Sequence, residues 1–213
     1  MKRILFIFFV VGMVVVSGVA NKVFGQSGQL NGRDYVDLGL SVKWATCNIG
    51  SDAPEGFGDY FAWGETKPKR VYDSDSYIFN FQDYPDMIVL PANADVAASF
   101  WKWGNGWRMP TKEEFEELIN KCTWVWMSNG YKVVGPNGNS IFLPAAGWKG
   151  ISLDGEAHFY NEGFGSYWSS TRERVSDDGR GGNANYLNFS STYYFVDLSS
   201  NYTFGHSVRP VCQ

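Results

Sequence analysis

Residues suited to non-covalent recognition are concentrated between Gly165 and His206. Tyr, Ser, Gly and Asn supply 22 of those 42 residues. Tyrosine offers a large contact area with few torsion angles to immobilise, while the three small residues offer adaptable hydrogen-bonding groups. We expect the segment 166–207 to bind a ligand through Arg172, Arg174, Arg180, Asn183, Asn185, Tyr186, Asn188, Tyr193, Tyr194, Asp197, Asn201, Tyr202 and His206.

Strand-forming residues must hold these side chains in place. Apolar residues recur at alternate positions, as in Leu187 and Phe189 and again in Val196 and Leu198. Alternation of this kind is typical of a β-strand with one buried face. The sequence therefore predicts a buried scaffold that carries an exposed polar and aromatic face.

Three arginines, Arg172, Arg174 and Arg180, flank a glycine-rich loop in the same segment. Asp177 and Asp178 lie among them, so one interpretation is a solvated loop of mixed charge. The other is a contact loop beside the ligand surface, where arginine and tyrosine serve as anchors. The residues favour neither interpretation over the other.

Residue patterns typical of enzymes and metal sites do not occur in the sequence. It has no Gly-x-Ser-x-Gly elbow, no phosphate-binding loop and no His-Glu-x-x-His motif. Its three cysteines and two histidines match no zinc spacing. We therefore expect no catalytic residue, no metal and no cofactor.

The first 25 residues are typical of a signal peptide. Lys2 and Arg3 precede an apolar run from Ile4 to Val16, and small residues follow near a cleavage site. We expect export to the periplasm, the cell surface or the medium, with no integral membrane span left after cleavage; a retained N-terminal anchor is the less favoured alternative. The exported chain then holds 15 basic against 22 acidic side chains, which argues against nucleic acid as a partner.

One helix is strongly indicated, from Thr111 to Lys121. Thr111 and Glu114 form a capping-box pattern, and Phe115 and Leu118 lie on one face at helical spacing. The glutamates of this segment then cap the helix or face water. A catalytic role for them is the less favoured interpretation.

Short strands and turns account for most of the remaining chain. An Asn-Gly turn at residues 129–130 predicts a hairpin. The predicted strands cover two pieces of 35–47, then 59–63, 123–127, 131–134, 140–143, 168–171, 184–191, 193–198 and 207–212, and a short helix covers 94–101. We predict a polar lead-in at 26–33 and one α+β domain at 34–213, mostly antiparallel, with one main helix and long irregular loops.

Several motifs in a fixed order resemble a known family. They are Asp37-Leu38-Gly39-Leu40, Trp44-Ala45-Thr46-Cys47-Asn48-Ile49-Gly50, Gly58-Asp59-Tyr60-Phe61-Ala62-Trp63-Gly64-Glu65, Gly106-Trp107-Arg108-Met109-Pro110-Thr111, Leu143-Pro144-Ala145-Ala146-Gly147, Tyr167-Trp168-Ser169-Ser170 and Ser207-Val208-Arg209-Pro210-Val211. Together they span residues 35–212 and resemble the Fibrobacter succinogenes major paralogous domain. The block that begins at Gly106 also resembles the formylglycine-generating enzyme superfamily.

The resemblance implies a C-type lectin-like fold, with a small twisted sheet, a flanking helix and terminal strands that meet. The end of the chain is also similar to the variable proteins of bacterial diversity-generating retroelements. In those proteins, adenine-directed mutagenesis rewrites exposed codons between fixed scaffold residues. The equivalent window here covers Arg172 to His206, and His206 departs from the phenylalanine of that pattern. The calcium-binding triplets of true C-type lectins are absent from the sequence.

The resemblance also implies a disulfide between Cys122 and Cys212, because C-type lectin-like domains often join the end of the helix to the last strand. Cys47 is then the remaining thiol. A Cys47–Cys212 disulfide stays open, since the terminal strands are expected to lie close together. The cysteine count favours one disulfide and one buried thiol over a redox role.

Three hypotheses for function follow. The first is an exported recognition module for an extracellular protein or glycan, in which the C-terminal segment is the binding surface. In one form of this hypothesis a retroelement diversifies that segment. The second is an enzyme of the formylglycine-generating type or an unrecognised hydrolase. The third is a structural subunit that packs against a partner in a surface appendage.

Overall fold

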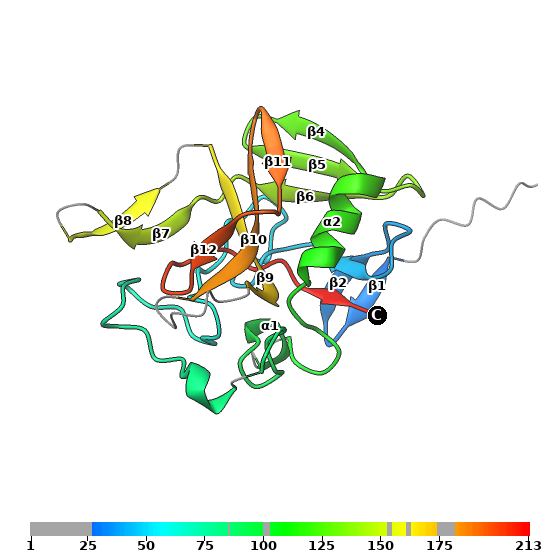
Figure 1. Cartoon of the computed structure of the whole chain (residues 1–213). Coiled ribbons are helices and arrows are strands. Elements are labelled where there is room, and N and C mark those ends of the chain that lie inside the picture. Colours follow the sequence, from blue (N-terminus) through cyan, green and yellow to red (C-terminus); the bar gives the residue numbers. More distant parts are fainter. Residues whose placement is uncertain (1–26, 85, 100–102, 153–154, 161–162, 174–181) are drawn as a thin grey trace, which may run out of the picture.

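The structure is a computed structural model that describes residues 27–84, 86–99, 103–152, 155–160, 163–173 and 182–213 (Figure 1). Its helices are α1 (Val96–Ser99), α2 (Lys112–Lys121) and the 3-10 helix η1 (Phe81–Asp83). Its strands are β1 (Gly28–Leu30), β2 (Arg33–Val36), β3 (Lys43–Ala45), β4 (Thr123–Met127), β5 (Gly130–Val134), β6 (Ser140–Pro144), β7 (Trp148–Ile151), β8 (Ala157–Tyr160), β9 (Gly165–Arg172), β10 (Asn183–Ser190), β11 (Tyr193–Phe195), β12 (Ser199–Asn201) and β13 (Val211–Cys212). The predicted signal peptide, residues 1–25, lies outside the described residues.

Small, mostly antiparallel sheets and one main helix make up the described part of the chain, in agreement with the predicted α+β class. Strands β1, β2, β3 and β13 form one sheet in that order, so the two ends of the described chain meet. Figure 1 shows the C-terminus beside β2. The predicted polar lead-in, residues 26–33, is not purely a lead-in, because it contains β1 and the first residue of β2.

Strand β10 is the centre of the sheet that carries most of the predicted ligand-binding segment. β9 pairs with one edge of β10, while β11 and then β12 pair in succession with its other edge. All of these pairings are antiparallel. The sequence predicted one strand over 193–198, whereas the structure ends β11 at Phe195 and begins β12 at Ser199.

One face of this sheet packs against helix α2. Leu187 and Phe189 of β10 join Phe115 and Leu118 of the helix in a buried hydrophobic cluster. Successive residues of a strand point to opposite faces, so the alternation of these apolar residues fixes which face of β10 is turned toward the helix. This helix-side face is the buried scaffold that the sequence predicted.

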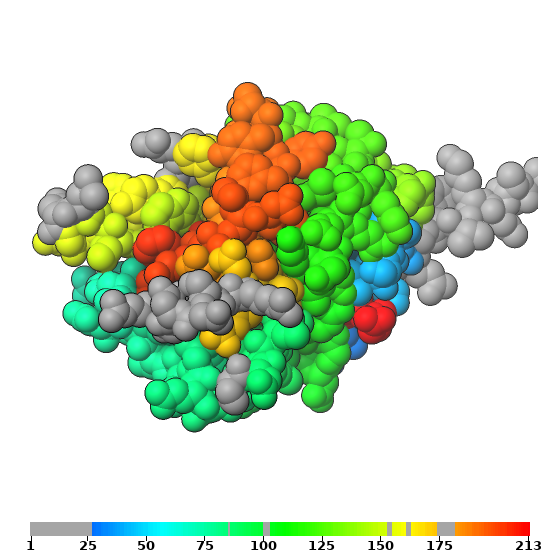
Figure 2. Space-filling model, viewed as in Figure 1, coloured from blue at the N-terminus to red at the C-terminus, as the bar shows by residue number. Residues whose placement is uncertain are grey.

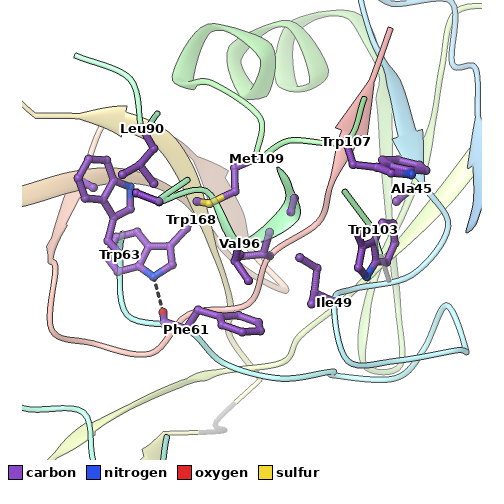
Figure 3. Close-up of a cluster of buried hydrophobic side chains, with 14 of the residues drawn as sticks. Ala45, Ile49, Phe61, Trp63, Leu90, Val96, Trp103, Trp107, Met109 and Trp168 are labelled. Atoms are coloured by element: carbon purple, nitrogen blue, oxygen red, sulfur yellow. Dashed lines mark hydrogen bonds between the residues drawn. The ribbon is translucent and has the colours of Figure 1, made fainter. Parts of the chain in front are cut away.

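The other face of the sheet is covered at one end by the segment around residues 61–63. Figure 3 shows Trp168 of β9 packed in a second hydrophobic cluster with Phe61 and Trp63. The Trp168 indole Nε1 donates a hydrogen bond to the Phe61 carbonyl at 2.7 Å, and the Trp63 Nε1 donates to the Ser169 carbonyl at 2.8 Å. The predicted strand at 59–63 forms only an isolated bridge, between Phe61 and His206.

The capping box predicted for the main helix is confirmed. The Thr111 hydroxyl accepts a hydrogen bond from the Glu114 backbone N–H at 3.3 Å, and the Glu114 carboxylate accepts one from the Thr111 N–H at 2.9 Å. Glu114 also pairs with Arg108. The same glutamate therefore accepts a backbone N–H at the start of the helix and holds the preceding segment through Arg108.

Substituting Thr111 by alanine is expected to lower the free energy of unfolding by about 1 kcal/mol, because the Glu114 N–H loses its acceptor. A drop of a few degrees in the thermal midpoint, on the order of 2–4 °C, would report it. Thr192→Ala, at an exposed turn position, is the control and is expected to change stability by less than about 0.5 kcal/mol. Equal midpoints for the two variants would contradict the capping role.

Two hairpins flank the central sheet, and the sequence predicted only one of them. β4 and β5 pair around the Asn-Gly turn as predicted, and β6 continues that sheet. β7 and β8 form a separate two-stranded sheet in the neighbourhood of β12 (Figure 1). The sequence signal for this hairpin is an Asp-Gly pair at 154–155, which separates Trp148 from Phe159 and Tyr160.

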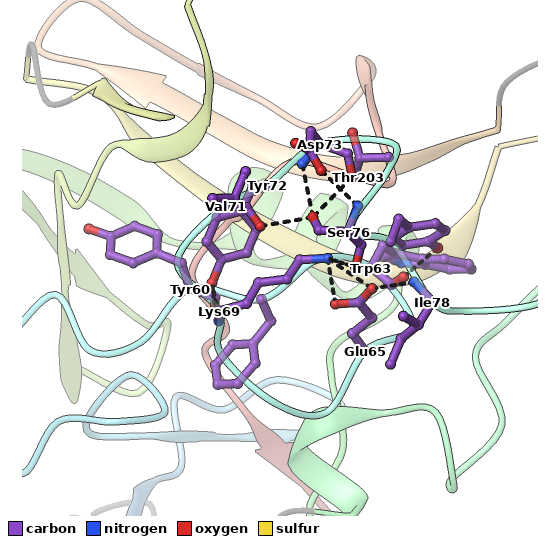
Figure 4. Close-up of polar contacts among 12 residues, drawn as sticks. Tyr60, Trp63, Glu65, Lys69, Val71, Tyr72, Asp73, Ser76, Ile78 and Thr203 are labelled. Atoms are coloured by element: carbon purple, nitrogen blue, oxygen red, sulfur yellow. Dashed lines mark hydrogen bonds and ion pairs between the residues drawn. The ribbon is translucent and has the colours of Figure 1, made fainter. Parts of the chain in front are cut away.

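The long irregular segment between Gly64 and Pro91 is pinned by buried polar contacts (Figure 4). The Lys69 ammonium lies 2.9 Å from the Glu65 carboxylate and donates to the Ser76 carbonyl at 3.0 Å. The same carboxylate accepts from the Ile78 N–H at 2.8 Å. A long loop in a compact fold must satisfy its own backbone, and this ion pair does so from within the loop.

The predicted disulfide between Cys122 and Cys212 is wrong. All three cysteines lie in the described part of the chain and all are free thiols, so a Cys47–Cys212 bridge is excluded as well. Cys122 packs beside the helix-side cluster and Cys212 belongs to the cluster of Trp168, so the two thiols are in different parts of the core. Burial raises the pKa of Cys122 to about 11 and also raises the pKa of Cys212.

Candidate functional site

Part of the face of β10 that is turned away from helix α2 carries a row of aromatic and polar side chains. We call this row the open face and define it as Tyr186, Asn188 and Ser190 of β10 with Tyr193 and Phe195 of β11. The register places Asn188 opposite Phe195 and Ser190 opposite Tyr193. Figure 2 shows β10 to β12 in orange across one side of the molecule, beside the yellow β7–β8 hairpin. None of the five side chains is fully buried.

Contacts within the open face hold its rings and amide in fixed positions. The rings of Tyr193 and Phe195 stack at 5.2 Å between centroids, and Tyr193 is 38% exposed. The Asn188 amide donates to the Ser166 hydroxyl at 3.2 Å. Burial, reinforced by neighbouring Tyr193, raises the pKa of Tyr186, so its phenol stays protonated and can both donate and accept hydrogen bonds.

His206 lies beneath one end of the open face and is almost completely buried, with 2% exposure. Its ring packs against Trp168 at 4.1 Å and Tyr186 at 5.1 Å. Nε2 lies 3.0 Å from the Ser200 hydroxyl, while Nδ1 has no hydrogen-bond partner among the described residues. Burial lowers the pKa of His206 to about 3, so this imidazole is neutral at physiological pH.

The β7–β8 hairpin adds aromatic residues that the sequence interpretation missed. Trp148 stacks on Tyr160 at 4.0 Å between centroids and contacts Phe204 at 4.9 Å. The Trp148 ring also lies 6.3 Å from the His206 ring. A continuous path of rings therefore leads from the open face through His206 to the hairpin.

Strand alternation separates two tyrosines that the sequence grouped together. Tyr194 is as exposed as Tyr193, at 38%, but its ring stacks on Trp124 at 4.6 Å on the helix-side face. Asp197 lies nearer the helix as well, with its carboxylate 3.4 Å from the Lys112 ammonium. These two residues do not belong to the open face.

Four more predicted contacts gather at the far end of the sheet. The Arg172 guanidinium donates to the Tyr202 hydroxyl at 3.0 Å and lies over the Phe81 ring at 4.8 Å. Asn183 pairs in register with Asn201, whose side-chain oxygen accepts from the Thr203 N–H at 3.0 Å. Arg172 therefore links this end of the sheet to the long loop, and none of the four residues belongs to the open face.

Three predicted contacts are buried, which corrects their expected exposure. Asn185 is 7% exposed, and Tyr202 stacks on Trp63 at 4.9 Å with 3% exposure. His206, the third, is covered as described above. Composition could not predict the burial of these positions, because tyrosine, histidine and asparagine occur on both the buried and the exposed faces of strands. Arg174 and Arg180 lie outside the described residues.

Two observations on the described residues concern metal and acid–base chemistry. No three His, Cys, Asp or Glu side chains gather there as metal ligands would. The buried carboxylate of Asp95 has a pKa raised to about 6 by burial, yet it accepts backbone hydrogen bonds from Met109 and Ala97, both at 2.8 Å. This carboxylate ties helix α1 to the segment before α2, which is a structural role.

Comparison with known proteins adds no relative: no family model, no curated protein and no solved structure matches this chain. The helices of the described residues were also compared with the length and hydropathy that a bilayer requires. None of them is long and apolar enough to span one.

Proposed function

We propose that this chain is an exported, non-catalytic recognition module with a C-type lectin-like fold, whose open face binds an extracellular protein or glycan. One observation carries the proposal. Tyr186, Asn188, Tyr193 and Phe195 share one face of paired strands, and each of these residues keeps part of its surface exposed. Rings with satisfied polar neighbours are the groups that dominate binding energy at protein surfaces.

The rigidity of the strands supports recognition without chemistry. Side chains already fixed by stacking and by the Asn188–Ser166 hydrogen bond lose little conformational entropy when a ligand docks. The helix-side cluster beneath the sheet holds the strands whatever residues occupy the open face. Such a division between scaffold and surface suits a face whose composition changes between relatives of the protein.

The function is testable by capture of the purified domain, residues 26–213, on immobilised glycans and cell-surface proteins. For any ligand recovered, Tyr193→Ala is expected to weaken binding about tenfold or more, since a central aromatic anchor contributes roughly 1.4 kcal/mol or above. Tyr194→Ala is the matched control, because its ring has the same exposure but lies on the helix-side face. It is expected to weaken binding by less than about twofold.

Two outcomes would count against the open face. Equal losses for the Tyr193 and Tyr194 variants would mean that general destabilisation, and not the face, explains the effect. An unchanged affinity for Tyr193→Ala combined with Phe195→Ala would place the ligand elsewhere. Thermal midpoints of each variant separate the first case from a true contact.

Diversification of the face is a further part of this proposal. Tyrosine and asparagine codons contain adenine, which is the base that retroelement mutagenesis targets. Variation among sibling cells confined to codons such as those of Tyr186, Asn188 and Tyr193 would support it. Invariance of those codons, with no reverse transcriptase gene nearby, would remove diversification and leave a fixed recognition module.

A further inference from the structure

A groove with a volume of about 410 Å³ lies on a sheet that takes no part in the open face. Its floor is the side of β4, β5 and β6 that is turned away from the hydrophobic cluster of helix α2. Phe142 and its cross-strand neighbour Lys132 line it, and the end of β2 and the loop after β3 close it. The lining residues are Val36, Thr46, Pro54, Glu55, Met127, Ser128, Asn129, Lys132, Ser140, Ile141 and Phe142, all of them described.

The groove holds one acid and one base, and neither forms an ion pair with another residue that the structure describes. Glu55 and Lys132 are exposed and make no ion pair or side-chain hydrogen bond with any described residue. Glu117 and Lys121 of helix α2, by contrast, pair with each other at 2.8 Å. An unpaired acid and an unpaired base on one concave surface are complementary to a ligand that carries both charges.

The remainder of the groove is apolar. Met127 is 47% exposed, and the half-buried Phe142 and Val36 line the groove with it. Ile141, which also borders the groove, is buried in the helix-side cluster. Exposed apolar surface of this kind gains from being covered, at roughly 25 cal/mol for each Å² removed from water. The cavity is near the lower end of the range of small-molecule sites, about 300–1,000 Å³, which favours a ligand of amino-acid or dipeptide size.

We propose that this groove binds a short zwitterionic peptide with apolar side chains. The Lys132 ammonium receives the ligand carboxylate, Glu55 receives the ligand ammonium, and the apolar side chains cover Met127 and Phe142. The site is independent of the proposed recognition role of the open face, so either can fail without the other.

The direct test is a titration of the purified domain with leucyl-leucine, followed by isothermal calorimetry or by amide chemical shifts. Two capped ligands separate the charges: N-acetyl-leucyl-leucine lacks the ammonium, and leucyl-leucine amide lacks the carboxylate. Each capped ligand is expected to bind about tenfold more weakly than the free dipeptide, as expected for the loss of one charge contact.

Variants then assign each charge to its partner. Lys132→Met is expected to weaken the binding of leucyl-leucine about tenfold and to abolish the difference in affinity between leucyl-leucine and its amide. Glu55→Gln is expected to abolish the difference in affinity between leucyl-leucine and N-acetyl-leucyl-leucine. Lys121→Met, at an exposed lysine of helix α2, is the control and leaves both differences intact.

Three results would overturn the proposal. The first is no saturable binding of leucyl-leucine up to about 20 mM, where even a weak site of about 1–10 mM would be detected. The second is binding that neither capping reduces, which would mean apolar contact without charge recognition. The third is a dimer in sedimentation that Lys132→Glu dissociates, which would make a second copy of the chain the occupant.

Discussion

Replacing Arg209 by leucine is expected to lower the free energy of unfolding by about 4 kcal/mol, the largest effect of any single change considered. Arg209 is completely buried. Its guanidinium donates to the Asn48 side-chain oxygen at 2.9 Å, to the Thr46 carbonyl at 2.8 Å and to the Phe142 carbonyl at 2.9 Å. It also donates to the Ala45 carbonyl at 3.1 Å.

The size of this effect follows from what leucine leaves behind. All four oxygens lose this donor. Those of Asn48 and Ala45 lie in buried hydrogen bonds, where an acceptor without a donor costs about 1–3 kcal/mol, and those of Thr46 and Phe142 are part-buried. No carboxylate among the described residues pairs with Arg209, so the guanidinium joins the loop after β3 and strand β6 through neutral oxygens alone. Burial lowers the pKa of Arg209, but the guanidinium remains charged.

Chemical denaturation of Arg209→Leu and Arg33→Leu would check this result. Arg33 is the control, because it pairs with an exposed partner, Asp52, at 2.6 Å, and such surface pairs contribute about 1 kcal/mol or less. Arg209→Lys keeps the charge with fewer donors and is expected to lose about half as much as Arg209→Leu. Comparable small losses for Arg209→Leu and Arg33→Leu would show that Arg209 does not hold these segments together.

Acidification is expected to destabilise the protein through His206 by about 3 kcal/mol between pH 7.5 and pH 4.5. The pKa of His206 is lowered from its ordinary value of 6.5 to about 3 by burial. Between these two values the unfolded chain binds a proton that the folded chain does not. Stability from this residue is therefore complete above pH 6.5 and is lost as the pH falls toward 3.

His206→Phe isolates this contribution. The phenylalanine ring keeps the packing against Trp168 and Tyr186 but cannot take up a proton. Between pH 7.5 and pH 4.5 the unfolding free energy of this variant should fall by about 3 kcal/mol less than that of the natural protein. The quantity to compare is the change in unfolding free energy of the variant minus that of the natural protein, because Asp95 contributes to both. Asp95, with a pKa raised to about 6, acts in the opposite direction and becomes less destabilising as the pH falls.

His158→Phe provides the matched control for the histidine experiment. His158 lies on β8 and its side chain is exposed. The pH dependence of this variant should follow that of the natural protein. If His206→Phe and the natural protein lose stability in parallel on acidification, His206 is not buried as a neutral imidazole under the open face.

Local chemistry made parts of the fold predictable from sequence. The capping box fixed the start of helix α2 at Thr111, and the Asn-Gly turn fixed the β4–β5 hairpin. Alternation of Leu187 and Phe189 identified the buried face of β10. In each case a few neighbouring residues determine the conformation, so no knowledge of the tertiary structure was required.

The candidate site was less predictable, because it depends on which face of a strand each residue occupies. Tyr193 and Tyr194 are adjacent and chemically identical, yet one lies on the open face and the other stacks on Trp124. Tyr202 is covered by Trp63, which is distant in sequence. The failure of the disulfide prediction has the same cause, since a resemblance locates cysteines on elements but does not bring their thiols together.

The most direct measurement of the recognition role is an amide and side-chain chemical-shift map of the domain, recorded with and without a ligand recovered from the capture screen. The account predicts that the largest changes cluster at Tyr186, Asn188, Tyr193 and Phe195, and that Tyr194 changes little. Perturbations centred on the helix-side face, or spread evenly over the domain, would contradict a binding surface on the outward side of β10 and β11.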